Sequence, residues 1–569
     1  MVDLVANEGK PTGSKRTGSK AKARREPRRN EKVPVLVIGA GPVGLALATD
    51  LGWRGVRCMV VEQHDGTVVH PRANTVNSRS MEFCRRWSIA GRVRESGAPA
   101  DFPSDIVYVT GLRGHEIARI TRPLHGGTEP LPTTPERSQR CNQLWFDPIL
   151  RERAAGFSSV SLSYQTRLDS CVQHEDHVLA RLTDLESGDA FEVECEYLVS
   201  CCGGHGPVPA MLGSRMEGTQ VLSYHLNVFL RIPELWEHHD KGKAAFYYFI
   251  TPAGMRTNLI ELNGNDLWRL SINNGQERID ADSVDVDALV RECIGPDVPY
   301  EVVSALPWTC RSLVANKWGE GRVWLAGDAV HQHGPQGGFG MNTGLGDAVD
   351  LGWKLAARLK GWGGQGLLDH YPTERRPVAV RNVGEATDNM SRSFDPEALA
   401  GIADDTDEGA ALRAKLGEEI LATRRKQFLS EGIALGYRYD GSPLVEPDGT
   451  PAPEDSVSTY VQTARPGSRA PHALLADGRS TLDLFGRGFT LLCFGAHAAA
   501  QAGGMVAAAR RRGMPLAVER IDEPEVAALY EARFTLVRPD GHVAWRGMSP
   551  PDDAARLLDR VRGAFSAAA

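Results

Sequence analysis

Three glycines and one carboxylate with fixed spacing indicate the first chemistry in this 569-residue chain. Gly39, Gly41 and Gly44 complete the pattern G-x-G-x-x-G around Pro42, and Glu62 follows 23 residues after Gly39. The first glycine of this pattern allows a tight turn, the second lets a pyrophosphate approach the backbone, and the third lets a helix pack closely on a strand. The Glu62 carboxylate can accept hydrogen bonds from a ribose diol and repels a 2′-phosphate, so the motif predicts FAD or NAD and disfavours NADP.

A second glycine-rich segment, residues 321–355, offers a flat surface for a planar ring. A short apolar run delivers Asp328 to the end of a strand, and a loop of small residues leads to a helix that we expect to begin near Gly344. Such a loop can lie against a ring and donate backbone N–H groups to it. His331 and His333 form a His-x-His pair, but no further ligands cluster near them in the sequence, so we predict no metal site.

A β-α-β unit must position the first motif. Val35–Ile38 and Cys58–Val61 are short apolar runs typical of buried parallel strands, and Pro42–Trp53 between them has a helical pattern. Val323–Ala326 predicts a buried strand before the second motif, and Leu345–Leu359 predicts a helix after it. These elements indicate an α/β fold with a doubly wound sheet.

Other segments predict a second sheet and a helical region. Residues 160–200 alternate apolar and polar side chains, which predicts an antiparallel meander, and residues 218–310 contain strand-like runs that we interpret as the floor of a second domain. Residues 101–135 are rich in Pro, Gly and Thr, and we expect them to form an excursion from the first sheet. Leu144–Ala155 predicts a helix, and residues 370–440 are expected to be mainly helical.

The residues after 470 predict a compact unit of their own. A linker rich in Pro, Gly, Ser and Asp precedes it at residues 441–470. Strands are expected at Phe489–Phe494 and Leu516–Arg520, with a helix at Ala498–Arg512 between them. Pro539-Asp540-Gly541 between two apolar runs predicts a hairpin.

Charge and cysteine usage exclude several classes of function. The formal net charge is −7, but residues 1–32 contain ten Lys or Arg and four Asp or Glu, a net of +6, so the rest of the chain carries −13. The basic segment is expected to be a disordered tail, and the mildly acidic body does not indicate a nucleic-acid binder. Ten scattered cysteines without a Cys-x-x-Cys pair indicate reduced thiols in a cytoplasmic protein. The most apolar long stretch, Phe489–Ala508, is interrupted by polar residues and glycines, so we expect no membrane span.

The second glycine-rich segment also resembles a family motif. Gly327–His331 matches G-D-A-x-H and Gly340–Gly344 matches G-M-N-x-G of the class A flavoprotein monooxygenases, the para-hydroxybenzoate hydroxylase family. The similarity covers roughly residues 33–565 and is nearest to the branch of phenol, chlorophenol and polyketide hydroxylases.

This resemblance implies FAD as the cofactor and NADPH or NADH as the reductant. It implies that Asp328 contacts the ribityl and pyrophosphate region and that residues 335–342 follow the isoalloxazine ring. It implies further contacts from Arg72, Arg140 and Gln143. The complete set of predicted cofactor contacts is Gly39, Gly41, Pro42, Gly44, Glu62, Gln63, Arg72, Arg140, Gln143, Gly327, Asp328, Pro335, Gly338, Gly340, Met341 and Asn342.

The family fold implies a Rossmann-like FAD domain, an inserted α+β substrate domain and a C-terminal thioredoxin-like domain. The last domain lacks Cys-x-x-Cys, so we favour a structural or oligomer-contact role, which leaves a homodimer open. The predicted division is a disordered basic tail at 1–32, the first part of the FAD domain at 33–217, the substrate domain at 218–310, the second part of the FAD domain with its helices at 311–440, a linker at 441–470 and the thioredoxin-like domain at 471–569.

One segment departs from the family pattern. Relatives carry C-D-G-x-x-S-x-V-R after a buried strand, whereas this chain has Cys202 at the Asp position, Gly206 at the Ser position and Pro209 at the Arg position. These changes remove charge-assisted contacts worth about 1.5–3 kcal/mol each. Either NAD(P)H docks through other residues, or flavin reduction is impaired.

The resemblance implies a monooxygenase that hydroxylates a phenolic or polyketide aromatic substrate with NAD(P)H and O2, through a flavin hydroperoxide. The sequence identifies no catalytic base. A Baeyer–Villiger or ring-opening oxygenase of the same family stays open, as does a flavin-binding protein with impaired NAD(P)H reduction. A flavin-dependent halogenase is disfavoured because W-x-W-x-I-P is absent from the sequence. A geranylgeranyl-reductase-like enzyme is disfavoured because it should lack the thioredoxin-like domain.

Overall fold

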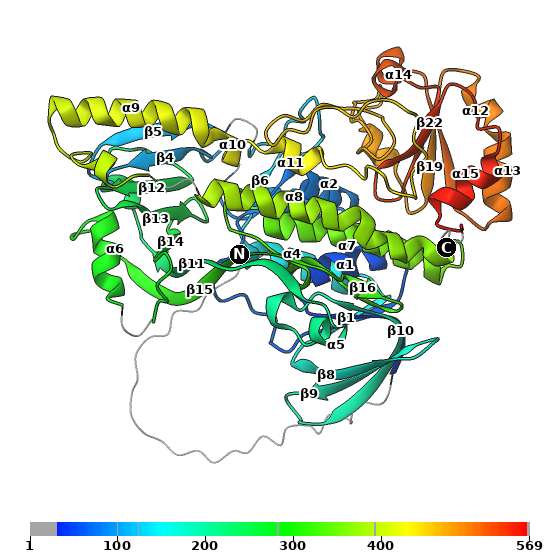
Figure 1. Ribbon diagram of the computed structural model, residues 1–569, viewed down its shortest axis with the longest axis horizontal. Helices are drawn as coiled ribbons and strands as arrows, with labels where there is room; N and C mark the ends of the chain where they lie inside the picture. The colour runs from blue at the N-terminus through cyan, green and yellow to red at the C-terminus, as the bar shows by residue number, and fades with distance from the viewer. Residues whose placement is uncertain (1–30, 100, 123–124, 281–283, 392–393, 566–569) are drawn as a thin grey trace.

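The computed structural model describes residues 31–99, 101–122, 125–280, 284–391 and 394–565. A large mixed sheet and a smaller C-terminal unit lie toward opposite ends of the molecule, and the long helices α7 (Phe339–Leu359) and α8 (Tyr371–Ser391) lie between them (Figure 1). None of the helices in the described ranges is long and apolar enough to cross a membrane.

The first sheet has the predicted doubly wound core. Its parallel strands follow the order β17 (Val323–Leu325), β10 (Ala190–Ser200), β1 (Glu31–Ile38), β2 (Cys58–Val61) and β7 (Val160–Ser163). Every residue of β2 is buried, as expected for a strand that is covered on both faces. Helix α1 (Pro42–Trp53) packs against α7 and β2, and the predicted bounds of α1 and β2 are confirmed.

Strand β1 begins before the apolar run that marks it in the sequence. Glu31 and Lys32, which the sequence assigns to the disordered tail, pair with Val193 and Glu194 of β10. An ion pair of 2.9 Å joins Lys32 to Glu194. The tail assignment is therefore wrong for these two residues, because backbone pairing extends the strand past its apolar part. The rest of the predicted tail, residues 1–30, lies outside the described residues.

The predicted meander at 160–200 has two parts. Strand β7 joins the sheet in parallel beside β2, while β8 (Thr166–Gln173), β9 (Val178–Asp184) and β10 pair antiparallel. The meander therefore returns the chain to the sheet centre, where β10 lies between β1 and β17.

The second sheet takes strands from a wider part of the chain than the sequence predicts. Its order is β18 (His331–Gln332), β15 (Glu301–Ala315), β11 (Met216–Arg231), β14 (Leu267–Asn273), β13 (Gly254–Glu261), β12 (Phe246–Thr251), β4 (Ile106–Val109) and β5 (Glu116–Ile120). Strands β4 and β5 lie within residues 101–135, and β4 pairs in parallel with β12. These residues leave the first sheet, as predicted, but the sequence did not predict that the buried run of β4 finds its backbone partners in the second sheet.

The helices after the second motif agree in type with the sequence but differ in extent. Helix α7 begins at Phe339, five residues before the predicted start, because Gly338 adopts φ +68° at its N-cap and turns the chain directly into the helix. Residues 370–440 are mainly helical, as predicted. The remaining elements before the C-terminal unit are β3 (Thr75–Val76), α2 (Ser78–Arg86), α3 (Ala90–Arg94), β6 (Gln139–Arg140), α4 (Gln143–Ala155), α5 (Val208–Met211), α6 (Val286–Ile294), β16 (Gly319–Glu320), α9 (Asp407–Thr423), α10 (Arg425–Phe428) and α11 (Glu431–Leu435).

The C-terminal unit has a thioredoxin-like arrangement. Its sheet has the order β20 (Leu516–Ile521), β19 (Phe489–Phe494), β21 (Phe534–Val537) and β22 (Val543–Gly547), with β19 and β20 parallel and the other neighbours antiparallel. The helix predicted at 498–512 is divided into α12 (Ala498–Gln501) and α13 (Gly503–Arg511), because two consecutive glycines, poor helix formers, follow the break. The other helices of the unit are α14 (Pro524–Tyr530) and α15 (Ala554–Val561).

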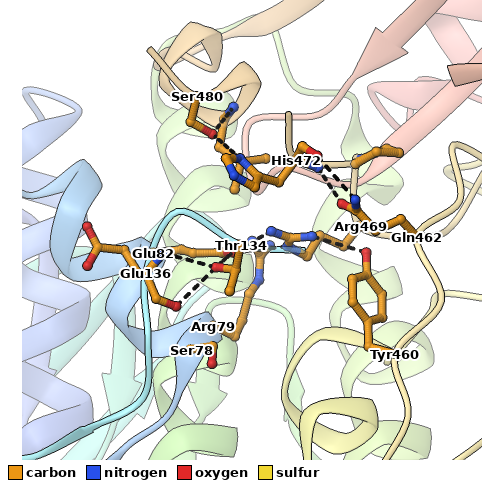
Figure 2. Close-up of polar contacts among 12 residues, drawn as sticks. Ser78, Arg79, Glu82, Thr134, Glu136, Tyr460, Gln462, Arg469, His472 and Ser480 are labelled. Carbon is orange, nitrogen blue, oxygen red and sulfur yellow. Dashed lines mark hydrogen bonds and ion pairs between the residues drawn. The ribbon is translucent and has the colours of Figure 1, made fainter. Parts of the chain in front are cut away.

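Buried ion pairs hold the C-terminal unit and the segment before it on helix α2. Figure 2 shows Arg469 between Glu82 and Tyr460, donating through Nε to Glu82 Oε2 at 3.0 Å and through Nη1 to the Tyr460 hydroxyl at 3.1 Å. Arg79 of the same helix donates to Glu82 at 2.8 Å and to the carbonyl oxygen of Asp540 at 2.7 Å. Because Arg469, Glu82 and Arg79 are buried, undocking the unit would leave charges without partners.

Candidate functional site

The turn between β1 and α1 has no room for a side chain at two of its three glycines. Gly39 has φ +100°, and a Cβ there would lie 2.6 Å from the carbonyl oxygen of Cys201. A Cβ at Gly44 would lie 2.0 Å from the carbonyl oxygen of Gly39. At Gly41 no atom lies within 4 Å of the Cβ position, and no side chain caps the start of α1. The backbone of Gly41, followed by Pro42 at the first helical position, therefore faces open space that can admit phosphate groups.

The Glu62 carboxylate is held beside this turn. Its Oε2 accepts a hydrogen bond from the N–H of Ala40 and its Oε1 from the N–H of His64, both at 2.9 Å. Each oxygen keeps a lone pair that can accept a ribose hydroxyl. The side chain of Gln63 is exposed, and its amide nitrogen lies 3.4 Å from His64 Nε2, so the structure gives Gln63 no contact with the turn.

One side chain joins the two glycine motifs. Val43, in the first turn of α1, packs against Gly327 and Gly344, where an added Cβ would lie 2.9 Å and 2.5 Å from a Val43 methyl carbon. Gly327 also has φ +65°, which favours glycine. Helices α1 and α7 therefore approach closely, and the two motifs are in direct contact although they are far apart in the sequence.

Asp328 and Arg72 lie in one region. The side chain of Asp328 is exposed to solvent, but the surrounding protein reduces the hydration of its carboxyl. The resulting loss of hydration raises the pKa of its carboxyl, while His331 and Arg72 act in the opposite direction. Arg72 is itself exposed. Two predicted contacts from separate segments are therefore close enough to interact electrostatically.

The loop of the second motif is anchored to strand β3. Asn342 is buried, and its Oδ1 accepts a hydrogen bond from the N–H of Asn77 at 2.9 Å. Its Nδ2 donates to the carbonyl oxygens of Thr75 at 2.9 Å and Gly338 at 2.7 Å. Asn342 thus fixes the shape of the loop by contacts within the protein. The other predicted loop residues are exposed or half-buried: Pro335, Gly338, Gly340 and Met341.

Two predicted cofactor contacts have protein partners of their own. Arg140 donates through Nη1 to Glu261 Oε2 at 2.7 Å and through Nη2 to the Glu261 carbonyl oxygen. The Gln143 side chain accepts a hydrogen bond from the N–H of Ala73 at 3.1 Å and donates to Asp147 at 3.3 Å. The structure thus shows both residues supporting the neighbouring chain, and their predicted contacts with the cofactor stay predictions.

A buried polar group behind the second motif is missing from the sequence-based predictions. The Asp347 carboxylate accepts hydrogen bonds from His331 Nε2 at 2.7 Å, the N–H of Gly327 at 3.2 Å and Arg375 Nε at 2.8 Å. Burial favours the protonated form, but His331 and Arg375 outweigh it and lower the pKa of Asp347, so the ionised group fixes Gly327. His333 Nε2 lies 3.1 Å from His331 Nδ1, which completes a protein network around the His-x-His pair. The sequence offered one signal for this buried group, because Asp347 and Arg375 are charged residues within apolar helical patterns.

Comparison with known proteins gives the family. A model of the FAD binding domain matches residues 32–386, and a model of the aromatic-ring hydroxylase C-terminal domain matches residues 463–568. The chain belongs to the class A flavoprotein monooxygenases. The predicted resemblance is thereby confirmed, and so is FAD as the cofactor.

Known relatives align with this flavoprotein monooxygenase along almost its whole length. The 4-methyl-5-nitrocatechol 5-monooxygenase of Burkholderia sp is 32% identical, and the alignment covers 93% of this chain and 97% of the relative. The tetracenomycin A2 monooxygenase-dioxygenase of Streptomyces glaucescens is 30% identical, with 94% and 98% covered.

Solved structures confirm the predicted fold class. The rebeccamycin biosynthetic enzyme RebC, solved with reduced flavin, is 41% identical with a TM-score of 0.86, and 95% of this chain and 100% of that chain are covered. The flavin-dependent monooxygenase PieE, solved in complex with FAD and substrate, is 30% identical with a TM-score of 0.85 and the same coverage.

Cys202, at which this monooxygenase departs from the family pattern, packs closely against Gly206. Cys202 Sγ lies 2.8 Å from Ser200 Oγ, and a Cβ at Gly206 would lie 1.7 Å from the same sulfur. The thiol therefore fills the space that a serine at position 206 would need. Burial raises the pKa of Cys202, so the thiol is protonated at neutral pH. The two substitutions fit one another and leave no carboxylate or hydroxyl at these family positions.

Proposed function

We propose that this chain holds FAD across its two glycine motifs and uses it, with molecular oxygen, to hydroxylate a phenolic or polyketide aromatic substrate. The contact of Val43 with Gly327 and Gly344 carries the proposal, because it joins a turn open to phosphates and a loop of small residues in one site. The names of the relatives support the reaction and the substrate class.

We assign different parts of FAD to different residues of the site. When bound, FAD supplies the redox chemistry with which this family adds one oxygen atom of O2 to a substrate. We assign the pyrophosphate to Gly41 and the start of α1, where unpaired N–H groups and the helix dipole favour anions. We assign the ribose to Glu62 and the ribityl region to Asp328 with Arg72 beside it. Asn342 holds the ring-binding loop against β3.

NADPH or NADH is the proposed reductant, as is typical of this family. For each hydroxylation, one oxygen atom enters the substrate and the other leaves as water, while NAD(P)H and a proton are consumed. The altered segment at Cys202 supports docking of the nicotinamide through other residues. The ten free cysteines support a cytoplasmic location, and the thioredoxin-like unit is our candidate for a homodimer contact.

The decisive experiment is a visible absorption spectrum of the purified protein, followed anaerobically as NADPH or NADH is added with phenols and polyketide-type aromatics. We expect two flavin bands that bleach faster with one aromatic. When 18O2 is then admitted to the reduced protein, we expect a product that gains 18O. Bands that do not bleach would favour the flavin-binding protein with impaired reduction. A colourless protein that cannot be loaded with FAD would contradict the proposed site.

A further inference from the structure

Arg122 is a buried cation without a partner in the described part of the protein. It follows strand β5 of the second sheet and is 7% exposed. Among the described residues, no hydrogen bond or ion pair reaches its guanidinium, and its Nε is buried without an acceptor. Burial and the positive charge of Arg140 lower the pKa of Arg122 to about 9. A guanidinium carries five N–H donors, so leaving it buried and unpaired is costly.

The buried carboxylates of this region are engaged elsewhere. Glu261 accepts hydrogen bonds from Arg140, one of them to its carboxylate at 2.7 Å. Both oxygens of Glu431 lie 3.1 Å from the Ser78 hydroxyl. The charge of Glu431 acts on Arg122, but neither carboxylate lies within ion-pair distance of it among the described residues, so its donors stay available to a ligand.

Aromatic rings surround the same position. The Arg122 guanidinium lies 5.9 Å from the ring centroid of Phe428, which lies 6.2 Å from that of Tyr248. Tyr248 stacks on Tyr108 at 5.2 Å and lies parallel to Phe246 at 6.4 Å. Strands β4 and β12 and helix α10 thus bring flat apolar surfaces next to an unpaired cation.

Arg269 connects this region with the proposed cofactor site. From strand β14 its Nη1 donates to the carbonyl oxygen of Arg72 at 2.5 Å. Burial raises the pKa of Tyr248, while the charges of Arg424, Arg269 and Arg122 act against that rise. A ligand at Arg122 would therefore lie against the second sheet, to which Arg269 connects the segment that carries Arg72.

We propose that Arg122 binds a carboxylate of the aromatic substrate, so that this monooxygenase acts on hydroxylated aromatic acids. The inference rests on the proposed function and narrows its substrate class. A carboxylate accepts two parallel N–H bonds from a guanidinium and satisfies donors that the protein leaves unpaired. The attached ring would lie against Tyr248 and Phe428, whereas a neutral phenol would leave Arg122 unpaired.

The test compares aromatic acids with their carboxamides on the FAD-loaded protein. The probes are 4-hydroxybenzoate and 1-hydroxy-2-naphthoate, each with its matched amide, and binding is measured from the change in flavin absorption. We expect at least one acid to bind about 10–100-fold more tightly than its amide. Arg122→Met should remove this preference and leave amide binding unchanged. Arg256→Met, which alters an exposed arginine on β13 of the same sheet, is the control and should retain the preference.

Thermal unfolding provides a readout that needs no ligand. Arg122→Met removes an unpaired buried charge, so the Tm of the FAD-loaded protein should rise, whereas removal of a structural contact would lower it. A lower Tm overturns the proposal, and so does equal affinity for acid and amide in both pairs or failure of both acids to bind. Failure of the parent protein to hold FAD would instead contradict the proposed function.

Discussion

Gly41 and Gly44 differ in what an added methyl group would meet. At Gly44 the methyl carbon would lie 2.0 Å from the carbonyl oxygen of Gly39, which is incompatible with the packing of α1 on the sheet. At Gly41 it would meet no protein atom within 4 Å and would enter the space that we assign to the pyrophosphate. A single substitution can therefore separate cofactor binding from folding.

We expect Gly41→Ala to leave the Tm of the apoprotein unchanged and to weaken FAD binding about tenfold or more, since even a loss of about 1.4 kcal/mol gives this factor. Titration of the apoprotein with FAD, followed by flavin fluorescence, measures the affinity. Gly384→Ala on α8, where a Cβ also meets no atom within 4 Å, should leave FAD affinity unchanged and raise the Tm slightly, because alanine is the better helix former. Unchanged affinity in Gly41→Ala would place the pyrophosphate elsewhere.

The sequence could predict those site residues whose type follows from backbone geometry. Gly39, Gly44 and Gly327 are required by positive φ angles or close approach, and such requirements leave a fixed pattern of residues. Arg140 is different, because its partner Glu261 lies on another strand 121 residues away. Pairings of this kind depend on tertiary structure, which no local pattern encodes.

Among the elements, helix α2 connects the second glycine motif with the C-terminal unit. At its start, Asn77 accepts the N–H of Ser80 at 2.9 Å and donates its own N–H to Asn342. Further along the helix, Glu82 pairs with Arg469 (Figure 2). The ion pair at one end thus helps to fix the helix whose other end holds the ring-binding loop.

Glu82 should make stability depend on pH in the acid range. Burial raises its pKa, but Arg469 and Arg79 outweigh this effect and lower the pKa from 4.5 to about 2. A carboxyl with a depressed pKa in the folded state adds stability above its unfolded pKa and loses it as pH falls toward the folded value. The shift corresponds to about 3 kcal/mol, so Glu82→Gln should lower the free energy of unfolding at pH 7 by about that amount.

Urea unfolding at a series of pH values measures this dependence. The parent should lose stability between about pH 5 and pH 2 more steeply than Glu82→Gln. Glu152→Gln, at an exposed position paired with Arg92, serves as the control and should follow the parent. Parallel curves for the parent and Glu82→Gln would show that the pair does not favour the ionised carboxylate.

Elements that are marked by a long apolar run and a clear turn were predicted well. Elements with a short run among loop-forming residues were not. The bounds of α1 and β2 follow from a glycine turn and an unbroken apolar run. The run of β4 is only four residues long and lies among Pro, Gly and Thr, so the sequence predicted an excursion from the first sheet and no strand. Its partner β12 begins 140 residues later, and pairing over that distance decides the outcome.

For the whole molecule, docking of the C-terminal unit depends on charges shared with the FAD domain. Arg538 is fully buried and donates through Nη2 to Glu374 at 2.8 Å and to Asp350 at 3.2 Å, on helices α8 and α7. Lys354 contacts both carboxylates at 2.6 Å. The sequence predicted a separate compact unit but not this contact, because Arg538 lies 164 residues after Glu374.

We expect the FAD domain and the C-terminal unit to unfold in one transition, since separation would leave buried charges uncompensated. Hydrogen exchange followed by mass spectrometry at rising temperature can resolve both parts of the chain. Their peptides should lose protection together in the parent and at a lower common temperature in Arg538→Met. Arg520→Met, at an exposed position of the unit, should behave as the parent. Earlier loss of protection in the C-terminal unit of the parent would contradict this coupling.

The hydrogen bond between Asn77 and Asn342 also orders events during synthesis of the chain. A ribosome makes the pyrophosphate turn first and makes the residue that closes the ring-binding loop 265 residues after Asn77. Arg469, which fixes α2, follows 387 residues after its partner Glu82. A nascent chain therefore presents half a cofactor site while residues 63–341 are made. We expect FAD to be captured only after Asn342 has been made, so a chain that ends before this residue should leave the ribosome without FAD.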